Sequence, residues 1–436
     1  MQAHRKPLVL VALAALLGAV FAYVSTADFA LHLDRQVHPL HCSLVPGAEA
    51  VEEDAAAGCR AAMVSPYSSF FRRTMWGGIP VSLLALGTFA FLLAFSATLI
   101  IAPPRETRRP AGFLALASLV PLVTSIVYLV LALGSVGQLC KVCVGIYISS
   151  ALLAGGVVWL LVRMKKGGSE GGFTPPERPI GPGVTAGGPA GGAQPHPRSK
   201  GRPLGPELRA AGWWVAWAVE LALVVAVPVL VYRSSLPDYG RAIASCGGLT
   251  RTEDPRGILV PLGTAHPRRD ATFVIDPLCP ACRDFHRRLE DMGDLEKLDA
   301  RMLLFPLDSS CNWMLDRPLH PGACVMSRAV LCAGDAARDV LEWGFENQEE
   351  LTALARRDEA ALVREVTQEF PRVEGCIGER RTERRLETGL QWAVDNHLPV
   401  LTPQLYIEGR RLCDEDTDLG LEYAMKRMLA ASGPRR

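Results

Sequence analysis

Five apolar runs limit what this chain can fold into more than any other feature. Four lie in the first 165 residues and the fifth follows a break: Leu8–Val24, Ile79–Ala102, Ala111–Val136, Val142–Val162 and Trp213–Tyr232. Each approaches the roughly 20 apolar residues that a helix needs to cross a bilayer. A hydrophobic share of 49% and a mean hydropathy of +0.18 also indicate a chain that is part membrane and part globular. We therefore expect a membrane all-α four-helix bundle, a fifth transmembrane helix and a separate soluble part.

The first run has a second interpretation. It follows "HRK" and ends near "STA", so it could be a signal peptide that is cleaved at that site. Its apolar stretch is longer than the roughly 7 to 15 residues of a signal-peptide core, which favours a retained membrane helix.

Basic residues predict the orientation of the helices. Arg5 and Lys6 precede the first run, "PPRETRRP" joins the second to the third, and "RMKK" follows the fourth. By the positive-inside rule these segments lie in the cytoplasm. The loop from about Ser25 to Gly78, the turn before Cys140 and the chain after the fifth run then share the opposite face. We expect a multi-pass membrane protein with a cytoplasmic N-terminus and the lipid bilayer as its environment.

Composition divides the chain into four predicted parts. Residues 1–166 form the four-helix membrane domain, and 167–211 form a cytoplasmic linker because Gly and Pro dominate that stretch. The fifth transmembrane helix occupies 212–233. Residues 240–436 form an extracytoplasmic soluble domain.

The soluble domain shows an α/β pattern. "ATFVID" and "RMLLFPLD" are strand-like, and "CRDFHRRLEDMGDLEKL" has helical spacing. The span from about Ala323 to Asn396 is mostly helical in pattern, and "PQLYIEGRRL" is typical of a strand and turn. This order predicts an α/β domain with a helical insertion.

Cysteine is the residue type that points to chemistry. The chain has twelve cysteines, too many for a reducing compartment unless they bind metal or react. Four of them stand in two C-x-x-C pairs, "QLCKVCVGIY" and "DPLCPACRDF". The net charge of +1 gives no electrostatic basis for nucleic-acid binding, so we expect none.

The second pair is predicted to be a reactive dithiol. Cys279 stands where a strand passes into a helix, and unpaired N–H groups at a helix start stabilise a thiolate. Cys279 should then be the exposed nucleophile and Cys282 the buried resolving thiol. Zinc is disfavoured because His286 alone cannot complete four ligands, and haem attachment would need C-x-x-C-H. We expect neither metal nor haem.

The strand, "CPAC" and helix, followed far downstream by "LTPQLYIEG", resemble the thioredoxin superfamily. The resemblance implies a cis-proline loop facing the dithiol, which maps onto Pro403 with Thr402 before it. The helical insertion resembles thiol oxidases of the DsbA type. The dipeptide between the cysteines is Pro-Ala here, not the Pro-His of strong oxidants.

The first pair, Cys140 and Cys143, stands at the outer end of the fourth run, on the face that also holds Cys42 and Cys59. This arrangement resembles the vitamin K epoxide reductase (VKOR) family, specifically bacterial members with a fused thioredoxin-like domain. "CRAAMVSPYSSFF", "GGIPVSLLALG" and the tyrosine after the dithiol carry the local likeness. The resemblance implies that Ser65, Cys143 and Tyr147 bind a quinone, either ubiquinone or menaquinone.

Two features depart from that family. Sixteen residues separate Cys42 from Cys59, a longer interval than expected. The polar side chain that should contact quinone before the second helix has no clear counterpart among Arg73, Thr74 and Met75.

The resemblance implies a quinone-dependent thiol-disulfide oxidoreductase of the bacterial cytoplasmic (inner) membrane that makes protein disulfides. Reduced secreted or periplasmic proteins would pass electrons to Cys279 and Cys282 and then to the loop cysteines. Cys140 and Cys143 would carry them to the membrane quinone pool, with Cys59 attacking Cys140. Two alternatives stay open: a thiol-disulfide reductase or isomerase system, and a non-enzymatic membrane-anchored folding module.

Six cysteines remain without a predicted redox role: Cys246, Cys311, Cys324, Cys332, Cys376 and Cys413. Six cysteines allow fifteen pairings, and sequence cannot choose among them. The Pro-rich stretch "CNWMLDRPLHPGAC" makes Cys311 with Cys324 the favoured structural bridge.

Overall fold

The computed structural model describes residues 2–34, 59, 62–103, 108–136, 139–167, 206–264 and 269–431. The chain forms two compact units. The first comprises Met1–Asp28, Leu40–Ala62 and Val81–Ser234; the second comprises Phe29–Pro39, Met63–Pro80 and Ser235–Arg436. Cys42 and most of the predicted linker lie outside the described residues.

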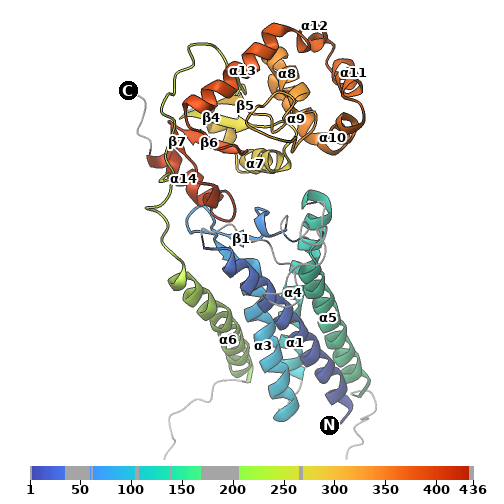
Figure 1. Ribbon diagram of the computed structural model, residues 1–436. Coiled ribbons are helices and arrows are strands. Elements are labelled where there is room, and N and C mark those ends of the chain that lie inside the picture. The colour runs from blue at the N-terminus through green and yellow to red at the C-terminus, as the bar shows by residue number, and fades with distance from the viewer. Residues whose placement is uncertain are drawn as a thin grey trace, which may run out of the picture. The chain divides into compact units, whose positions relative to one another are not determined.

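The first unit is built from long apolar helices (Figure 1). They are α1 (Gln2–Leu31), α3 (Val81–Ile101), α4 (Arg108–Leu131), α5 (Lys141–Gly167) and α6 (Pro206–Ser235), and α4 runs on into a π-helical turn, η1 (Ala132–Val136). Five of the described helices are long and apolar enough to cross a membrane. The prediction of five membrane helices is confirmed.

Helix α1 extends beyond the predicted end of the first run. It passes without a break through the "STA" site, where the hydroxyl of Thr26 donates a hydrogen bond to the carbonyl of Ala22 and shares another with the hydroxyl of Ser82. Val11 and Ala15 on the same helix are fully buried. The packing of α1 along its length favours a retained helix over a cleaved signal peptide.

Large side chains fill the core of this bundle. Phe89, Leu92, Leu114 and Leu153 are fully buried at the centre of an apolar cluster that draws on α1, α3, α4 and α5. Helix α6 approaches α3 closely at Gly87, where a Cβ atom would lie 2.9 Å from the Cα atom of Val225. Only glycine permits this approach without a shift of the backbone.

A five-stranded mixed sheet organises the second unit. Its order is β3–β5–β4–β6–β7, and β4 pairs with β5 in parallel while the other pairs are antiparallel. The strands are β3 (Val260–Pro261), β4 (Arg269–Ile275), β5 (Leu298–Leu304), β6 (Gln404–Ile407) and β7 (Arg410–Arg411). Helix α7 (Pro280–Asp291) and the short turn η2 (Leu295–Lys297) connect β4 to β5. This βαβ unit followed by two antiparallel strands is the predicted thioredoxin-like arrangement.

The predicted helical insertion lies between β5 and β6 (Figure 1). It contains α8 (Ala323–Cys332), α9 (Ala337–Glu346), α10 (Gln348–Arg357), α11 (Glu359–Glu369), α12 (Glu374–Ile377) and α13 (Arg380–Asp395), with short turns η3 (Gly334–Ala336) and η4 (Pro371–Val373). After the sheet come η5 (Asp414–Asp416) and the last helix, α14 (Leu421–Ala431). One apolar core joins the insertion to β4, β5 and α7.

A short hairpin also belongs to the second unit. Its strands are β1 (Ser69–Phe70) and β2 (Ile79–Pro80). Between them Arg72 is buried and donates hydrogen bonds to the carbonyls of Met63 and Val64 and to the carboxylate of Glu422 on α14. The Arg72–Glu422 ion pair, at 3.1 Å, therefore ties this hairpin to the last helix of the same unit.

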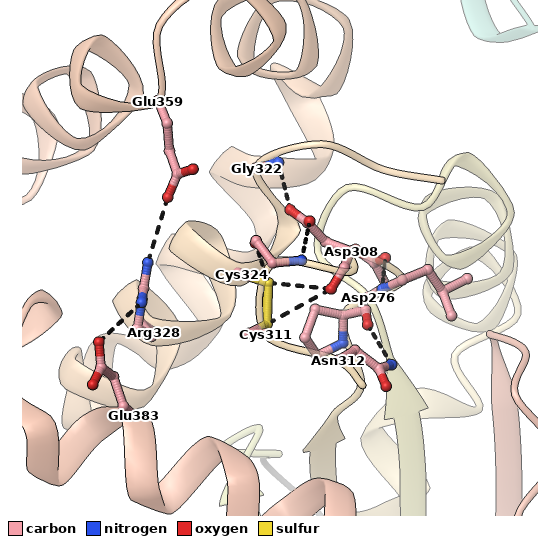
Figure 2. The surroundings of a disulfide bond; sticks show 12 residues. Asp276, Asp308, Cys311, Asn312, Gly322, Cys324, Arg328, Glu359 and Glu383 are labelled. Carbon is pink, nitrogen blue, oxygen red and sulfur yellow. Dashed lines mark hydrogen bonds and ion pairs between the residues drawn. A yellow bond between two sulfur atoms is a disulfide. The ribbon is translucent and has the colours of Figure 1, made fainter. Parts of the chain in front are cut away.

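Three disulfides hold the second unit: Cys246–Cys413, Cys311–Cys324 and Cys332–Cys376. The predicted pairing of Cys311 with Cys324 is confirmed, and Figure 2 shows this bridge with its surroundings. It closes the loop that leads from β5 into α8. None of these three bridges uses a cysteine from either C-x-x-C pair.

Candidate functional site

The CPAC dithiol, Cys279 and Cys282, lies where β4 ends and α7 begins. Cys279 is the N-cap residue of α7 and Pro280 occupies the first helical turn, where its missing N–H is no loss. The carbonyl of Asp276 accepts a hydrogen bond from the N–H of Cys279, and the amide of Gln348 donates to the carbonyl of Cys279. Both Cys279 and Cys282 are buried free thiols, so the predicted burial of Cys282 is confirmed and the predicted exposure of Cys279 is wrong.

The two thiols have opposite acidities. A hydrogen bond from the Cys282 thiol is the main influence that lowers the pKa of Cys279 from 9.0 to about 6, and the Thr402 side chain lowers it further. Burial is the main influence that raises the pKa of Cys282 well above 9.0. These directions favour Cys279 as the thiolate and Cys282 as the protonated thiol, as the position of Cys279 at a helix start predicts. The roles of nucleophile and resolving thiol stay predictions.

The loop before β6 lies beside this dithiol. The peptide bond between Thr402 and Pro403 is cis, as the resemblance implies. The thiol of Cys279 lies 3.7 Å from the carbonyl oxygen of Thr402. Pro403 is therefore next to the reactive sulfur in the fold.

The low pKa of Cys279 predicts a pH profile for its alkylation. A folded pKa below the usual value stabilises the reduced folded protein above pH 9, and this stabilisation is lost as the pH falls through about 6. We expect iodoacetamide to label Cys279 of the reduced chain with a half-maximal rate near pH 6. Mass spectrometry of the Cys279 peptide measures this rate. Cys282 should stay unlabelled as the internal control, and a midpoint near pH 9 would contradict the assignment.

The membrane dithiol, Cys140 and Cys143, lies at the start of helix α5 in the first unit. Cys140 directly precedes α5 and is buried, whereas Cys143 in its first turn is half-buried. The Sγ atom of Cys140 lies 3.3 Å from the Sγ atom of Cys59. These sulfurs share an apolar cluster with Val24 and Phe21 of α1. The fold therefore brings a loop cysteine against the membrane dithiol, although 81 residues separate them in sequence.

The surroundings of Cys143 suit an apolar ring. Tyr147 lies one helical turn after Cys143 and is half-buried. The ring of Phe21 packs against Gly145 so closely that a Cβ atom there would lie 2.7 Å from it. One thiol and one phenol beside aromatic and aliphatic side chains match a quinone, which has a flat apolar ring with two polar oxygens.

The family comparison covers this site. Residues 9–157 match the vitamin K epoxide reductase family. These residues are a VKOR family domain. The domain contains Cys59, Ser65, Cys140, Cys143 and Tyr147. No curated protein sequence matches the chain significantly.

Three crystal structures with partial similarity are DsbA or ScsC proteins. Wolbachia pipientis alpha-DsbA1 has 16% identity and a TM-score of 0.28, over 36% of this chain and 76% of its own. DsbA from Xylella fastidiosa has 19% identity and a TM-score of 0.29, over 39% of this chain and 92% of its own. Proteus mirabilis ScsC, described in a transitional conformation, has 17% identity and a TM-score of 0.27, over 52% of this chain and 97% of its own.

The structure does not bring the other predicted residues of the VKOR domain to the Cys140–Cys143 dithiol within the described part of the chain. Cys42 lies outside the described residues. Ser65 is buried and belongs to the second unit, where its hydroxyl accepts a hydrogen bond from the N–H of Tyr67. Arg73, considered for quinone contact, instead pairs with the buried carboxylate of Asp294. The roles of Cys42 and Ser65 therefore stay predictions.

One cluster of possible metal ligands surrounds His286. The ligand atoms of His286, Glu290 and Glu342 lie within 4.8 Å of one another. The guanidinium of Arg338 donates to both carboxylates at 2.6 Å, so a cation of the chain already occupies the position a metal would need. His286, whose Nε2 atom lies 3.4 Å from the Glu290 carboxylate, is the main influence that lowers the pKa of Glu290 to about 2, with Arg338 adding to it.

Sequence analysis missed two residues next to the CPAC dithiol. Asp276, three residues before Cys279, is fully buried, and His320 from the disulfide loop lies 2.7 Å from its carboxylate. The "D-P-L-C" spacing was visible, but no local pattern connects it with a histidine 44 residues later. The VKOR domain and the CPAC dithiol together make this chain a membrane thiol–disulfide oxidoreductase.

Proposed function

We propose that this protein is a membrane thiol oxidase that makes disulfide bonds in secreted proteins and passes the electrons to a quinone. The observation that carries the proposal is the 3.3 Å contact between the Sγ atoms of Cys59 and Cys140. Thiol–disulfide exchange requires an attacking sulfur in contact with the sulfur it attacks. This contact joins a loop cysteine to a dithiol that begins a membrane helix.

The electrons would move through three dithiols by exchange. A client dithiol reduces the Cys279–Cys282 disulfide and becomes a disulfide itself. The reduced Cys279–Cys282 pair then reduces a Cys42–Cys59 disulfide. Cys59 attacks the Cys140–Cys143 disulfide at Cys140, which forms a Cys59–Cys140 bond and releases the Cys143 thiolate. Cys42 next attacks Cys59, releases Cys140 as a thiol and restores the loop disulfide.

Cys143 and Tyr147 are the residues that would hold the quinone. A bound ubiquinone or menaquinone would accept the two electrons and two protons that the dithiol loses. Cys143 would stand nearest to it as the thiolate, and the Tyr147 hydroxyl one turn away would donate a hydrogen bond. The apolar side chains of Phe21 and Val24 would exclude water from this position.

Membrane topology supports the meeting of these groups. With the five described spans, the segments before the first and after the fifth would lie on opposite faces, and the basic residues predict a cytoplasmic position for the first of these segments. Cys59, Cys140 and Cys279 would then share the extracytoplasmic face, which is the periplasm in a bacterial cell with two membranes. Protein clients meet the CPAC dithiol in water, whereas a lipid-soluble quinone meets Cys143 at the membrane.

Two other functions predict different behaviour. A reductase or isomerase system needs a cytoplasmic electron donor, and none of the described cysteines is predicted on that face. A non-enzymatic folding module needs only structural disulfides. The four free thiols at Cys140, Cys143, Cys279 and Cys282 favour a reactive role over a structural one.

Quinone depletion tests the proposal in membranes. We expect Cys140, Cys143, Cys279 and Cys282 to accumulate as thiols when quinone is absent, because the terminal acceptor is missing. Alkylation trapping followed by mass spectrometry reads each cysteine. The Cys332–Cys376 disulfide should stay oxidised as the internal control. If the four thiols stayed oxidised without quinone, the relay would be wrong.

A further inference from the structure

The loop closed by Cys311 and Cys324 holds a histidine against the turn that presents Cys279. The N–H groups of Leu319 and His320 both donate to the carbonyl of Leu307, at 2.9 and 3.0 Å. The Nδ1 atom of His320 lies 2.7 Å from Oδ2 of Asp276. Backbone and side chain thus both fix His320, and Figure 2 shows Asp276 beside the disulfide.

Asp276 is the buried charge of this region. Its carboxylate accepts hydrogen bonds from the N–H groups of Leu278 and Leu307, each at 2.8 Å, and its side chain is inaccessible to solvent. A buried carboxylate three residues before a cysteine opposes formation of a thiolate there, because like charges repel in a medium of low dielectric constant. The Pro-Ala dipeptide between Cys279 and Cys282 offers no positive charge to offset it.

We propose that His320 is a positioning residue for the CPAC dithiol: as an imidazolium it pairs with Asp276 and cancels the negative charge beneath the Cys279 thiolate. The disulfide Cys311–Cys324 holds the loop that carries it. The loop therefore supplies from outside the motif the positive charge that a histidine between the two cysteines would supply within it. This inference rests on the proposed role of Cys279 as the reactive thiol.

The charges around His320 support this role. Burial alone would lower the pKa of His320, but the hydrogen bond and charge of Asp276 outweigh it, and the charges of Cys279 and Asp308 raise the pKa further. Asp308 itself accepts hydrogen bonds from the N–H groups of Ser310 and Gly322, so it belongs to the same loop anchor. The groups that influence Cys279 include Cys282, Asp276 and Thr402, and the charge of Asp276 raises the pKa of Cys279. The interaction between Cys279 and His320 acts on both groups.

Replacing His320 tests the inference through the alkylation profile of Cys279. In the reduced full chain, His320→Gln should shift the midpoint upward by about one pH unit and slow labelling roughly fivefold at pH 6. Above about pH 9 the rates of the variant and the wild type should converge, because the thiolate is then fully formed in both. His320→Lys, which keeps a positive charge, should restore most of the low midpoint. If the role of His320 were purely structural, the labelling rates would not converge above pH 9 and His320→Lys would not restore the low midpoint.

Two further variants complete the test. Arg317→Gln removes an exposed positive charge from the same loop and should leave the profile unchanged. In an Asp276→Asn background, adding His320→Gln should move the midpoint no further, since the charge to be cancelled is gone. A His320→Gln profile that superimposes on the wild type would overturn the inference. So would an equal shift in both backgrounds.

The assay separates this inference from the proposed function. It uses chemically reduced protein without client or quinone, so a failed relay would leave the alkylation profiles unaffected. Conversely, an unshifted His320→Gln profile would leave quinone-dependent oxidation of the four thiols intact.

Discussion

Cys143→Ala is expected to abolish the oxidation of a reduced protein by quinone. Without Cys143 the membrane dithiol cannot form a disulfide, so electrons from Cys59 have no route to the acceptor. We expect turnover of the purified chain to fall by roughly 10³-fold or more, because the variant lacks a residue that forms a covalent bond in the reaction. Quinol formation with a reduced unfolded client measures the loss.

Val144→Ala is the matched control for this variant. Val144 is the next residue on the same helix turn and is half-buried like Cys143, but it offers no thiol. Its replacement should leave turnover within about twofold of the wild type. Full activity in Cys143→Ala would rule out the membrane dithiol as the last carrier.

Arg72→Ala is expected to destabilise the second unit by about 3–5 kcal/mol. The variant leaves Glu422 as a buried carboxylate without its closest cation, and breaking a buried ion pair from one side costs this much. It also frees the carbonyls of Met63 and Val64 that Arg72 now satisfies. Hydrogen exchange of the Leu421–Ala431 peptide in the full chain should accelerate accordingly.

Arg73→Ala provides the comparison for Arg72. The side chain of Arg73 is 42% exposed, and its partner Asp294 keeps a second cation in Lys297 at 2.6 Å. We expect a loss below about 1 kcal/mol, as for exposed ion pairs. If the two variants lost equal free energy of unfolding, burial would not determine how much the Arg72–Glu422 pair contributes to stability.

Features that depend on local sequence could be predicted. Apolar runs of membrane length became helices α1, α3, α4, α5 and α6 because the length of a span is a local property. The strand, CPAC and helix followed from residue order and from Pro280 at the helix start. Cys311 and Cys324 could be paired because only a short loop separates them.

Features that depend on distant contacts could not be predicted. Cys246 pairs with Cys413 across 167 residues, and no spacing rule selects that partner. The Arg72–Glu422 pair joins residues 350 apart, and no local pattern connects the two. The approach of His320 to Asp276 arises only when the disulfide loop folds back over the end of β4. Each of these contacts depends on tertiary structure.

The most direct test of the relay is the disulfide trapped in Cys143→Ala. In this variant Cys140 can attack a Cys42–Cys59 disulfide at Cys59, which forms a Cys59–Cys140 bond and releases the Cys42 thiol. Rapid acid quenching and alkylation of Cys42 preserve this bond before Cys42 reverses the exchange. Mass spectrometry of the non-reduced, digested protein identifies the linked peptides, and Cys140→Ala serves as the control that lacks them. The 3.3 Å contact predicts that Cys59 is linked to Cys140. A link between Cys42 and Cys140, or no link at all, would contradict this order of electron transfer.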